Sequence, residues 1–427
     1  MEEKVVKIGV IGCGTVGFNF IKSFTRKRRE IEKKTGVKFV IKKVYDRDEK
    51  KIKPFPEISG NSVKEIIEDP EIDIVVELIG GIHPAYEFIV KSIKNGKSVI
   101  TANKALLSEK GKEIFNLAVK NKVYVGYETS VAGAIPIIKT LKESFIGNKI
   151  TKMLGILNGT TNFILSQMFK YGMNFSDALK KAQKLGYAEA DPTLDIAGMD
   201  TAHKLSILST LAFNKPVSWK DIYVEGIDKI EFTDIKYAHE FGYRIKLLAI
   251  AKISSNFLEL RVHPALLPSN HLLSSVEGVY NGIFIEGDMI GNSLLYGEGA
   301  GGKAAASSVI SDVVEIGKKI LQKEYISPPF YENKKLTIKS MDKISIRYYF
   351  RFTALDKPGV LAKISKILGK NNISISSVIQ KQENPQKAVP IVMLTHKAEE
   401  RNVKKAIKEI DNLDVIKKPT IIIRVEE

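Results

Sequence analysis

The sequence predicts an α/β protein with a doubly wound parallel sheet, followed by an α+β domain and a ferredoxin-like module. In residues 1–130, short apolar runs alternate with helical patterns, as in a parallel sheet covered by helices. In residues 131–300 the pattern changes to helices mixed with alternating strands, which suits antiparallel strands with helices on one face. Residues 344–427 follow the order βαββαβ of the ferredoxin-like plan. The 427 residues accommodate two or three domains of ~150 residues.

The first part has the clearest alternation of elements. Residues 5–11 form an apolar run that stops at Gly12, and residues 16–34 form a long amphipathic stretch. Further strands are expected at 38–45, 72–78, 98–101 and 123–127, and helices at 85–94 and 109–120.

The later elements follow from the same patterns. In the second part we expect helices at 175–185, 201–212 and 237–245 and strands at 257–262 and 282–288. A glycine-rich loop at 297–302 precedes a long helix at 304–322, and we expect residues 301–327 to return to the first domain. Pro328 and Pro329 open a linker that extends to residue 343. The module is expected to contain strands at 344–353, 373–381, 387–396 and 415–425 and helices at 358–369 and 398–410.

Composition excludes several classes of protein. The net charge of +17 comes from lysines dispersed among acids, without a basic run interleaved with aromatics, so we expect no nucleic-acid partner. No stretch reaches the ~18 apolar residues of a membrane helix, and the N-terminus lacks the build of a signal peptide. The single cysteine excludes an intramolecular disulfide. We therefore expect a cytoplasmic protein.

Gly12, Cys13, Gly14, Thr15, Val16 and Gly17 match the pattern G-x-G-x-x-G. The match lies between the first strand and the first helix, where glycines allow a tight turn and close approach to a pyrophosphate. The helix N-terminus attracts the phosphates. This context predicts a Rossmann-type dinucleotide site.

Two neighbouring residues bear on the choice between NAD and NADP. Asp46 ends the second strand, where an acid would bind the ribose hydroxyls and favour NAD. Arg47 follows it, and an arginine there would accept a 2′-phosphate and favour NADP. The two residues favour opposite cofactors, with a slight preference for NADP.

The candidate catalytic groups are lysines and acids. Cys13 lies in the pyrophosphate turn, away from the place where a cysteine nucleophile would attack an aldehyde, and no zinc-ligand spacing occurs. Asp200 and Lys204 are four residues apart on one helix face, after an acid-rich loop at 186–195 that suits an ammonium group. Lys104 follows a parallel strand at the sheet edge where ligands bind.

Several segments together carry a family resemblance. They are GVIGCGTVG (9–17), ELIGG (77–81), TANK (101–104), GILNGTTNFIL (155–165), GYAEADPTLD (186–195), GMDTAHK (198–204) and GEGAGG (297–302). Over essentially its whole length the sequence resembles homoserine dehydrogenase of the monofunctional type with a C-terminal ACT domain. Two positions depart from that pattern: Cys13 stands where alanine is common, and Glu298 where proline is common.

The resemblance implies a reaction and the residues that perform it. The reaction is the NAD(P)H-dependent interconversion of L-aspartate 4-semialdehyde and L-homoserine, in the synthesis of threonine, methionine and isoleucine. Lys204 would donate the proton and Lys104 would bind and polarise the aldehyde, with Asp200 holding Lys204 protonated. Gly186, Glu189, Asp195 and Asp200 would bind the substrate. Gly80, Thr101, Lys104, Gly301 and Gly302 would join the cofactor site.

The same resemblance implies three further properties. Glu128, with the carbonyls of Val131, Gly133 and Ile135, would hold a monovalent cation, sodium in the family. The ACT domain, with the loop at 356–361 and Asn371-Asn372, would bind an amino-acid effector, with threonine the leading candidate and a purely dimerising role the alternative. The enzyme would be a homodimer or a higher homo-oligomer.

Two other functions remain open from the residues alone. One is a dehydrogenase for another amino-acid aldehyde or a 2-hydroxy acid, although the acid-rich loop favours a substrate with an ammonium group. The other is a non-catalytic cofactor-binding sensor, which predicts loss of a lysine at 104 or 204. Both lysines are present.

Overall fold

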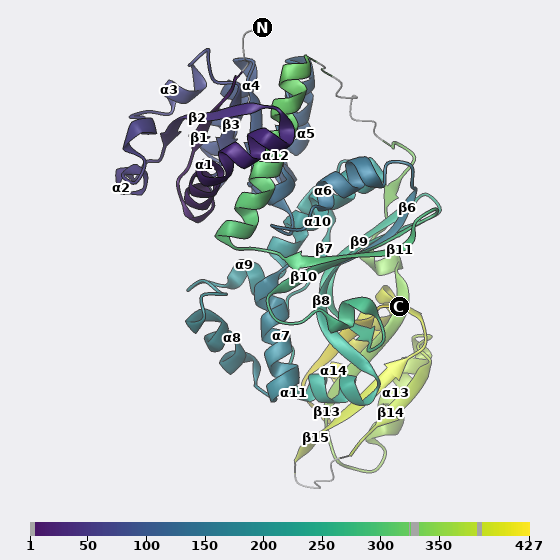
Figure 1. Cartoon of the computed structure of the whole chain (residues 1–427). Coiled ribbons are helices and arrows are strands. Elements are labelled where there is room, and N and C mark those ends of the chain that lie inside the picture. The colour runs from purple at the N-terminus through teal and green to yellow at the C-terminus, as the bar shows by residue number, and fades with distance from the viewer. Residues whose placement is uncertain (1–4, 324, 326–332, 382–386) are drawn as a thin grey trace.

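Two β-sheets organise the computed structural model (Figure 1). The structure describes residues 5–323, 325, 333–381 and 387–427. A five-stranded parallel sheet lies at one end of the molecule, and a twelve-stranded mixed sheet extends through the rest of it. Among the described residues, no helix combines the length and the apolar character that a membrane crossing requires.

The parallel sheet has the strand order β2-β1-β3-β4-β5. Its strands are β1 (Val5–Ile11), β2 (Lys38–Tyr45), β3 (Ile74–Glu77), β4 (Ser98–Thr101) and β5 (Val125–Gly126). Its helices are α1 (Thr15–Thr35), α2 (Glu49–Ile52), α3 (Lys64–Ile67), α4 (Ala85–Lys94) and α5 (Lys104–Lys120). The strand order reverses between β1 and β3, which is where open α/β sheets bind ligands. The predicted doubly wound fold is confirmed.

A helix from much later in the chain completes the core of this domain. The helix α12 (Gly302–Gln322) packs beside α1 (Figure 1). Its buried residues Val309 and Val313 join a core cluster with Ile8 of β1 and Phe20 of α1. Gly317 lets α12 approach closely, because a Cβ there would overlap the ring of Phe39. The core beside the parallel sheet is therefore completed by residues that lie some 300 positions downstream.

The mixed sheet begins with the strands of the second domain. These are β6 (Ile150–Ile156), β7 (Tyr223–Val224), β8 (Tyr243–Ser254), β9 (Phe257–Pro268), β10 (Tyr280–Gly287) and β11 (Gly291–Glu298). The accompanying helices are α6 (Ile137–Lys139), α7 (Gly159–Tyr171), α8 (Phe175–Lys184), α9 (Thr193–Ile196), α10 (Met199–Phe213) and α11 (Phe232–Glu240). Residues of α7, α10 and α11 bury their apolar sides with β8 and β9 in the largest core cluster.

The C-terminal module forms the other end of the mixed sheet. Its elements are β13 (Ser345–Leu355), α13 (Val360–Lys370), β14 (Ile375–Ile379), β15 (Ala388–Thr395), β16 (Ala398–Glu399), α14 (Glu400–Asp411) and β17 (Ile416–Val425). The strand order β17-β13-β15-β14 confirms the ferredoxin-like plan. The strand β17 also pairs in parallel with β9, through Arg424 opposite Ala265 and Val425 opposite Leu266. One sheet therefore joins the two domains, which the sequence did not predict.

Three expectations about local structure need correction. The helix expected at 237–245 is wrong: α11 ends at Glu240, Gly242 adopts φ 82°, and β8 begins at Tyr243. The helix expected at 109–120 begins at Lys104 instead, because the side chain of Asn103 caps its N-terminus. Residues 328–332 of the expected linker lie outside the described residues. Further along, Thr337 and Ile338 form the strand β12, which pairs with β9.

Candidate active site

The glycine motif forms the tight turn that its pattern predicts. Gly12 has φ 102° and donates its N–H to the carbonyl of Tyr45 at 2.8 Å, which ties β1 to the end of β2. A Cβ on Gly17 would overlap the carbonyl oxygen of Gly12, so α1 can approach the turn only with glycine there. A Cβ on Gly14 meets no atom within 4 Å, so the backbone faces open space at the N-terminus of α1. Open space at a helix N-terminus suits a phosphate.

Asp46 takes part in the turn itself. Its carboxylate accepts the N–H of Cys13 at 2.7 Å and that of Asp48 at 3.0 Å, and its side chain is buried. Arg47 is exposed beside it. Burial, with a smaller contribution from Asp46, raises the pKa of the Cys13 thiol to about 11. The thiol is therefore protonated at neutral pH and is not a nucleophile.

The carboxyl ends of β3 and β4 are tied together by Glu77, a residue for which the sequence indicated no role. Its carboxylate accepts the hydroxyl of Thr101 at 2.5 Å and the N–H of Ile79 at 2.7 Å. Complete burial raises the pKa of Glu77 to about 7. Asn103 donates to the carbonyl of Gly81, so the exposed Gly80 loop is held at the same edge.

The glycine loop before α12 lies against the dinucleotide turn. A Cβ on Gly302 would overlap the side-chain amide of Asn19 and lie 3.1 Å from the methyl group of Thr15. Gly301 has φ 120°, a backbone conformation that L side chains rarely adopt. The structure thus brings Gly301 and Gly302 to the first turn of α1.

Asp200 holds both candidate lysines. The ammonium of Lys204 lies 2.7 Å from its Oδ2, and the ammonium of Lys104 lies 2.5 Å from its Oδ1. Lys204 also donates to the carbonyl of Leu157 at 2.6 Å. Lys204 and Asp200 are buried, whereas the side chain of Lys104 is 41% exposed. The first residue of α5 and the first turn of α10 therefore meet at one carboxylate.

The two lysines have pKa values displaced in opposite directions. Burial lowers the pKa of Lys204, and the charge of Lys104 adds to this, although Asp200 works against both. For Lys104 burial is outweighed by Asp200, with smaller contributions from Asp195 and Glu189, so its pKa is raised. Lys104 and Lys204 hold the pKa of Asp200 below its usual range despite burial. The expected effect of Asp200 on Lys204 has the expected sign, because Asp200 raises the pKa of this lysine, but burial outweighs it and the net displacement is downward. Lys204 is the more acidic ammonium, as a proton donor should be.

Asn158 organises the acids and was missed as a functional residue. Its side-chain amide donates to Asp195 at 2.7 Å and to Asp200 at 3.0 Å, while its carbonyl oxygen caps α7. The only signal in the sequence was an asparagine before Gly159, which is typical of a helix cap. Glu189 is exposed, and Gly186, with φ 75°, follows Leu185, the C-cap of α8. The charge of Glu189 adds a small contribution to the raised pKa of Lys104.

The loop at 128–135 lies beneath the glycine loop. Glu128 is buried, and its two carboxylate oxygens accept the N–H groups of Ile138 and Lys139 at 2.8 and 2.9 Å. The carbonyl of Gly133 accepts the hydroxyl of Ser308 at 2.6 Å, and Val131 and Ile135 are buried. A Cβ on Gly133 would lie 2.7 Å from the carbonyl oxygen of Gly299. Among the described residues, no three His, Cys, Asp or Glu side chains gather as metal ligands.

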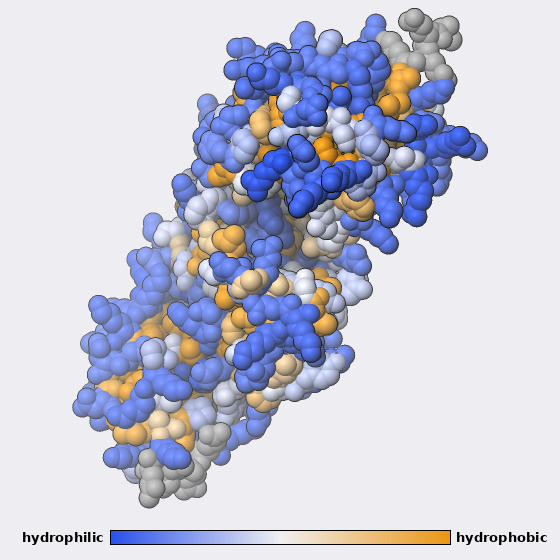
Figure 2. Space-filling view, turned by 90° about the vertical axis from the view of Figure 1, so that its left-hand side faces the viewer, coloured by the Kyte–Doolittle hydropathy of each residue, from blue (hydrophilic) through white to orange (hydrophobic). Residues whose placement is uncertain are grey.

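The face that carries α9 and the start of α1 is hollowed between the nucleotide-binding end and the rest of the molecule (Figure 2). The site combines a dinucleotide turn, two lysines on one carboxylate and neighbouring acids. These are the parts of a dehydrogenase for an amino-acid substrate.

Comparisons with known proteins agree with this class over the whole chain. Residues 12–128 match the family "Homoserine dehydrogenase, NAD binding domain", residues 136–314 match "Homoserine dehydrogenase", and residues 348–415 match "ACT domain". The chain is 44% identical to the homoserine dehydrogenase of Neisseria gonorrhoeae, with 99% of each chain covered. It is 43% identical to that of Helicobacter pylori, with 99% of this chain and 100% of the relative covered.

Solved structures give the same result. A homoserine dehydrogenase from Thiobacillus denitrificans superimposes with a TM-score of 0.93 at 42% identity, with 99% of each chain covered. A hyperthermophilic archaeal homoserine dehydrogenase in complex with NADPH has a TM-score of 0.64 at 26% identity, and covers 77% of this chain and 100% of its own.

The fold and the site define a nicotinamide-dependent oxidoreductase with a C-terminal ACT domain. The chain belongs to the homoserine dehydrogenase family.

Proposed function

We propose that the protein interconverts L-aspartate 4-semialdehyde and L-homoserine with NAD(P)H, in the synthesis of threonine, methionine and isoleucine. The observation that carries this proposal is the buried Lys204 ammonium, held between Asp200 and the carbonyl of Leu157. A reduced aldehyde develops negative charge on its oxygen, and a buried ammonium both stabilises that charge and supplies a proton.

The chain's residues divide the chemistry between them. A bound reduced nicotinamide supplies the hydride to the aldehyde carbon. Lys204 transfers its proton to the aldehyde oxygen, so that a hydroxyl forms, and the neutral amine is reprotonated afterwards. Lys104, whose pKa is raised, keeps its proton and polarises the same oxygen. In the reverse direction the neutral Lys204 accepts the hydroxyl proton.

The acids around the lysines account for an amino-acid substrate. Glu189 in the loop after Gly186, Asp195 in α9 and Asp200 at the start of α10 offer carboxylates to the substrate ammonium group. Asn158 orients two of them through its side-chain amide. A 2-hydroxy acid would bring no ammonium group to the carboxylates of Glu189 and Asp195, which disfavours it.

For the cofactor we propose NADP in preference to NAD. The proposal rests on Arg47, which is exposed beside the dinucleotide turn and available to a 2′-phosphate. The NADPH in the archaeal relative is consistent with this choice.

A monovalent cation, sodium in this proposal, would be held by Glu128 and by the carbonyls of Val131, Gly133 and Ile135. Carboxylate and carbonyl oxygens suit a hard cation, and the carboxylate of Glu128 keeps lone pairs beyond its two hydrogen bonds. Burial raises the pKa of Glu128, so a cation would stabilise its charged form. Replacing sodium by a bulky organic cation should lower the melting temperature if the proposal is right.

The ACT domain is proposed to bind threonine at the loop 356–361, where Gly359, with φ 87°, is the N-cap of α13.

The enzyme is proposed to be cytoplasmic and a homodimer or higher homo-oligomer. The edge strand β11 supports this assembly, since Tyr296 stacks on Tyr280 and both rings are exposed there. Light scattering with and without threonine measures the oligomeric state and whether threonine changes it.

The deciding experiment mixes the purified protein with L-homoserine and sodium and follows nicotinamide absorbance with NAD and NADP in parallel. We expect reduction by the wild type and a loss of about 100- to 10,000-fold in Lys204→Ala. No reduction with either cofactor, in a folded protein, would reject the proposed reaction.

A further inference from the structure

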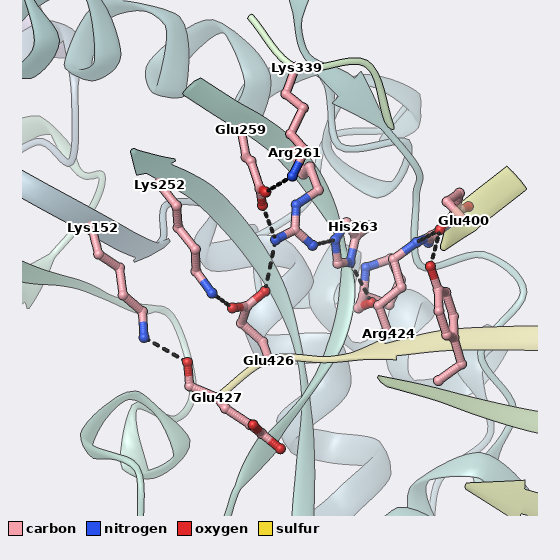
Figure 3. A network of polar contacts seen from close by, with 12 residues as sticks. Lys152, Lys252, Glu259, Arg261, His263, Lys339, Glu400, Arg424, Glu426 and Glu427 are labelled. Atoms are coloured by element: carbon pink, nitrogen blue, oxygen red, sulfur yellow. Dashed lines mark hydrogen bonds and ion pairs between the residues drawn. The ribbon is translucent and has the colours of Figure 1, made fainter. Parts of the chain in front are cut away.

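Arg424 lies at the seam between the ACT domain and the catalytic domain and binds carboxylates on both sides. From β17, its Nε and Nη2 donate to Glu400 of α14 at 3.0 and 2.6 Å (Figure 3). Its Nη1 donates to Glu225 of the catalytic domain at 2.8 Å, and its Nη2 to the hydroxyl of Tyr223 at 3.0 Å. Arg424 and Glu400 are buried, so this network is shielded from solvent.

Glu225 belongs to a segment that is fixed to the mixed sheet. It follows β7, whose residues Tyr223 and Val224 pair with β9, and its N–H donates to the carbonyl of Val262 at 2.8 Å. Its carboxylate also accepts the hydroxyl of Tyr223 at 2.9 Å. The position of this segment therefore depends on both β9 and Arg424.

The residues after Glu225 support the helix that carries Asp195. A Cβ on Gly226 would overlap the carbonyl oxygen of Ile196 and lie 2.8 Å from the Cα of Ala197. The N–H of Ile227 donates to that same carbonyl at 2.9 Å. The segment is thus in backbone contact with the C-terminal end of α9, one residue beyond Asp195.

The same segment supports the start of α10. Gly198, with φ 84°, precedes this helix, and a Cβ there would lie 3.2 Å from methyl groups of Val224 and Val262. Two residues later comes Asp200, which holds both lysines. A shift of the segment at 224–227 would therefore be transmitted to Asp195 and Asp200 through these close contacts.

We propose that Glu225 is a positioning residue: its ion pair with Arg424 fixes the segment beneath Asp195 and Asp200 and so links the ACT domain to the substrate pocket. The role in catalysis rests on the proposed function. Coupling of this kind requires that the ion pair differs between two states of the ACT domain. An effector that tilts β17 would change it, because Arg424 is part of that strand.

The chain offers a closely matched control for Glu225. Arg351 of the ACT domain binds Asp234 with Nε and Nη2 at 2.7 and 3.0 Å and Glu231 with Nη1 at 3.2 Å. Like Arg424, Arg351 makes two hydrogen bonds to one carboxylate and one ion pair to a second. Its contacts, however, join the ACT domain to α11, and not to the segment beneath α9. Glu225→Gln and Glu231→Gln thus each remove one arginine–carboxylate contact in this seam, and Glu231 is the more exposed of the two, at 50% of its side chain against 27% for Glu225.

The test compares wild type, Glu225→Gln, Glu225→Asp and Glu231→Gln. We expect Glu225→Gln to raise the KM for homoserine about 2- to 30-fold, with kcat and the KM for the nicotinamide changed much less. Glu225→Asp should restore part of the loss, and Glu231→Gln should match the wild type. Equal KM values in the two glutamine variants would overturn the proposal.

Hydrogen exchange provides a readout without activity. In the free enzyme, amides of residues 193–204 should exchange faster in Glu225→Gln than in Glu231→Gln. Unchanged exchange in Glu225→Gln would overturn the link, whatever the activity. If the wild type fails to oxidise homoserine while the exchange difference is present, the proposed reaction fails and the link stands.

Discussion

The ammonium of Lys204 and the carboxylate of Asp200 lie 2.7 Å apart on one face of α10, and Lys104 occupies the other oxygen of that carboxylate. The two lysines therefore share one negative charge. Burial makes Lys204 the weaker base of the two, which agrees with the proposed division of proton transfer to Lys204 and substrate polarisation to Lys104.

Replacing Asp200 by Asn should move the pH profile of aldehyde reduction. Reduction requires the protonated Lys204, so activity is present below the pKa of this lysine and is lost as pH rises through it. Asp200 raises that pKa against the effect of burial. Its removal should shift the alkaline limb of kcat to lower pH, together with an overall loss of activity. A limb that stays in place or moves to higher pH would contradict the assignment of Lys204 as the proton donor.

Gly17→Ala and Gly14→Ala should separate packing of the turn from cofactor binding. Because the new Cβ at residue 17 overlaps the carbonyl of Gly12, Gly17→Ala should lower the melting temperature of the cofactor-free enzyme. Gly14→Ala meets no protein atom and should leave it unchanged. Both should weaken nicotinamide binding, measured by calorimetry. Equal melting temperatures for the two variants would show that α1 is not packed on this turn as described.

Arg47→Ala should decide the cofactor preference. If Arg47 receives the 2′-phosphate, its loss removes a charged hydrogen bond worth about 1.5–3 kcal/mol, or about 10- to 100-fold in the KM for NADP. The KM for NAD should change little. Lys94→Ala, at the C-terminal end of α4, serves as a charge-matched control. A parallel rise in both KM values would count against a 2′-phosphate contact.

Glu77 should make the protein less stable as pH rises from 5 to 8. Its pKa is raised from 4.5 to about 7 in the folded state, so the unfolded chain releases this proton first. The stabilising contribution of protonated Glu77 is full below pH 4.5 and is lost as pH rises through 7, by about 3 kcal/mol. The melting temperature of Glu77→Gln relative to wild type should therefore increase over this range.

Glu71→Gln is the control for that experiment. Glu71 is exposed and paired with Lys7 and Lys42, which lower its pKa, so its contribution is constant above pH 5. A difference between Glu77→Gln and wild type that is flat from pH 5 to 8 would show that Glu77 ionises normally.

The parts of the site that follow from local pattern were predictable. The glycine turn could be predicted from the pattern of residues 12–17 alone, and the pairing of Asp200 with Lys204 from their helical spacing. The contact of Lys104 with Asp200 and the role of Asn158 depend on how separate elements pack, which no local pattern encodes. The resemblance assigned a role to Lys104 but gave Asn158 none.

The fold shows the same division. The alternation of the first domain and the order of the C-terminal module were confirmed, because each strand there carries its own apolar run. The start of strand β8 was predicted to be helical. The apolar residues that follow Gly242 also fit helical spacing, so the pattern did not show that the helix ends before this glycine. The pairing of β17 with β9 joins two sheet edges, and such a choice depends on which edges remain uncovered.

The return of α12 to the first domain has a consequence for synthesis on the ribosome. Val309, Val313 and Ile316 fill the core beside β1, yet they are translated after the entire second domain. The nascent nucleotide-binding domain must therefore wait, with an apolar face uncovered, until residue 322 has left the exit tunnel. The cofactor turn can therefore reach its final packing only after α12 has been synthesised, although the turn itself is among the first residues of the chain.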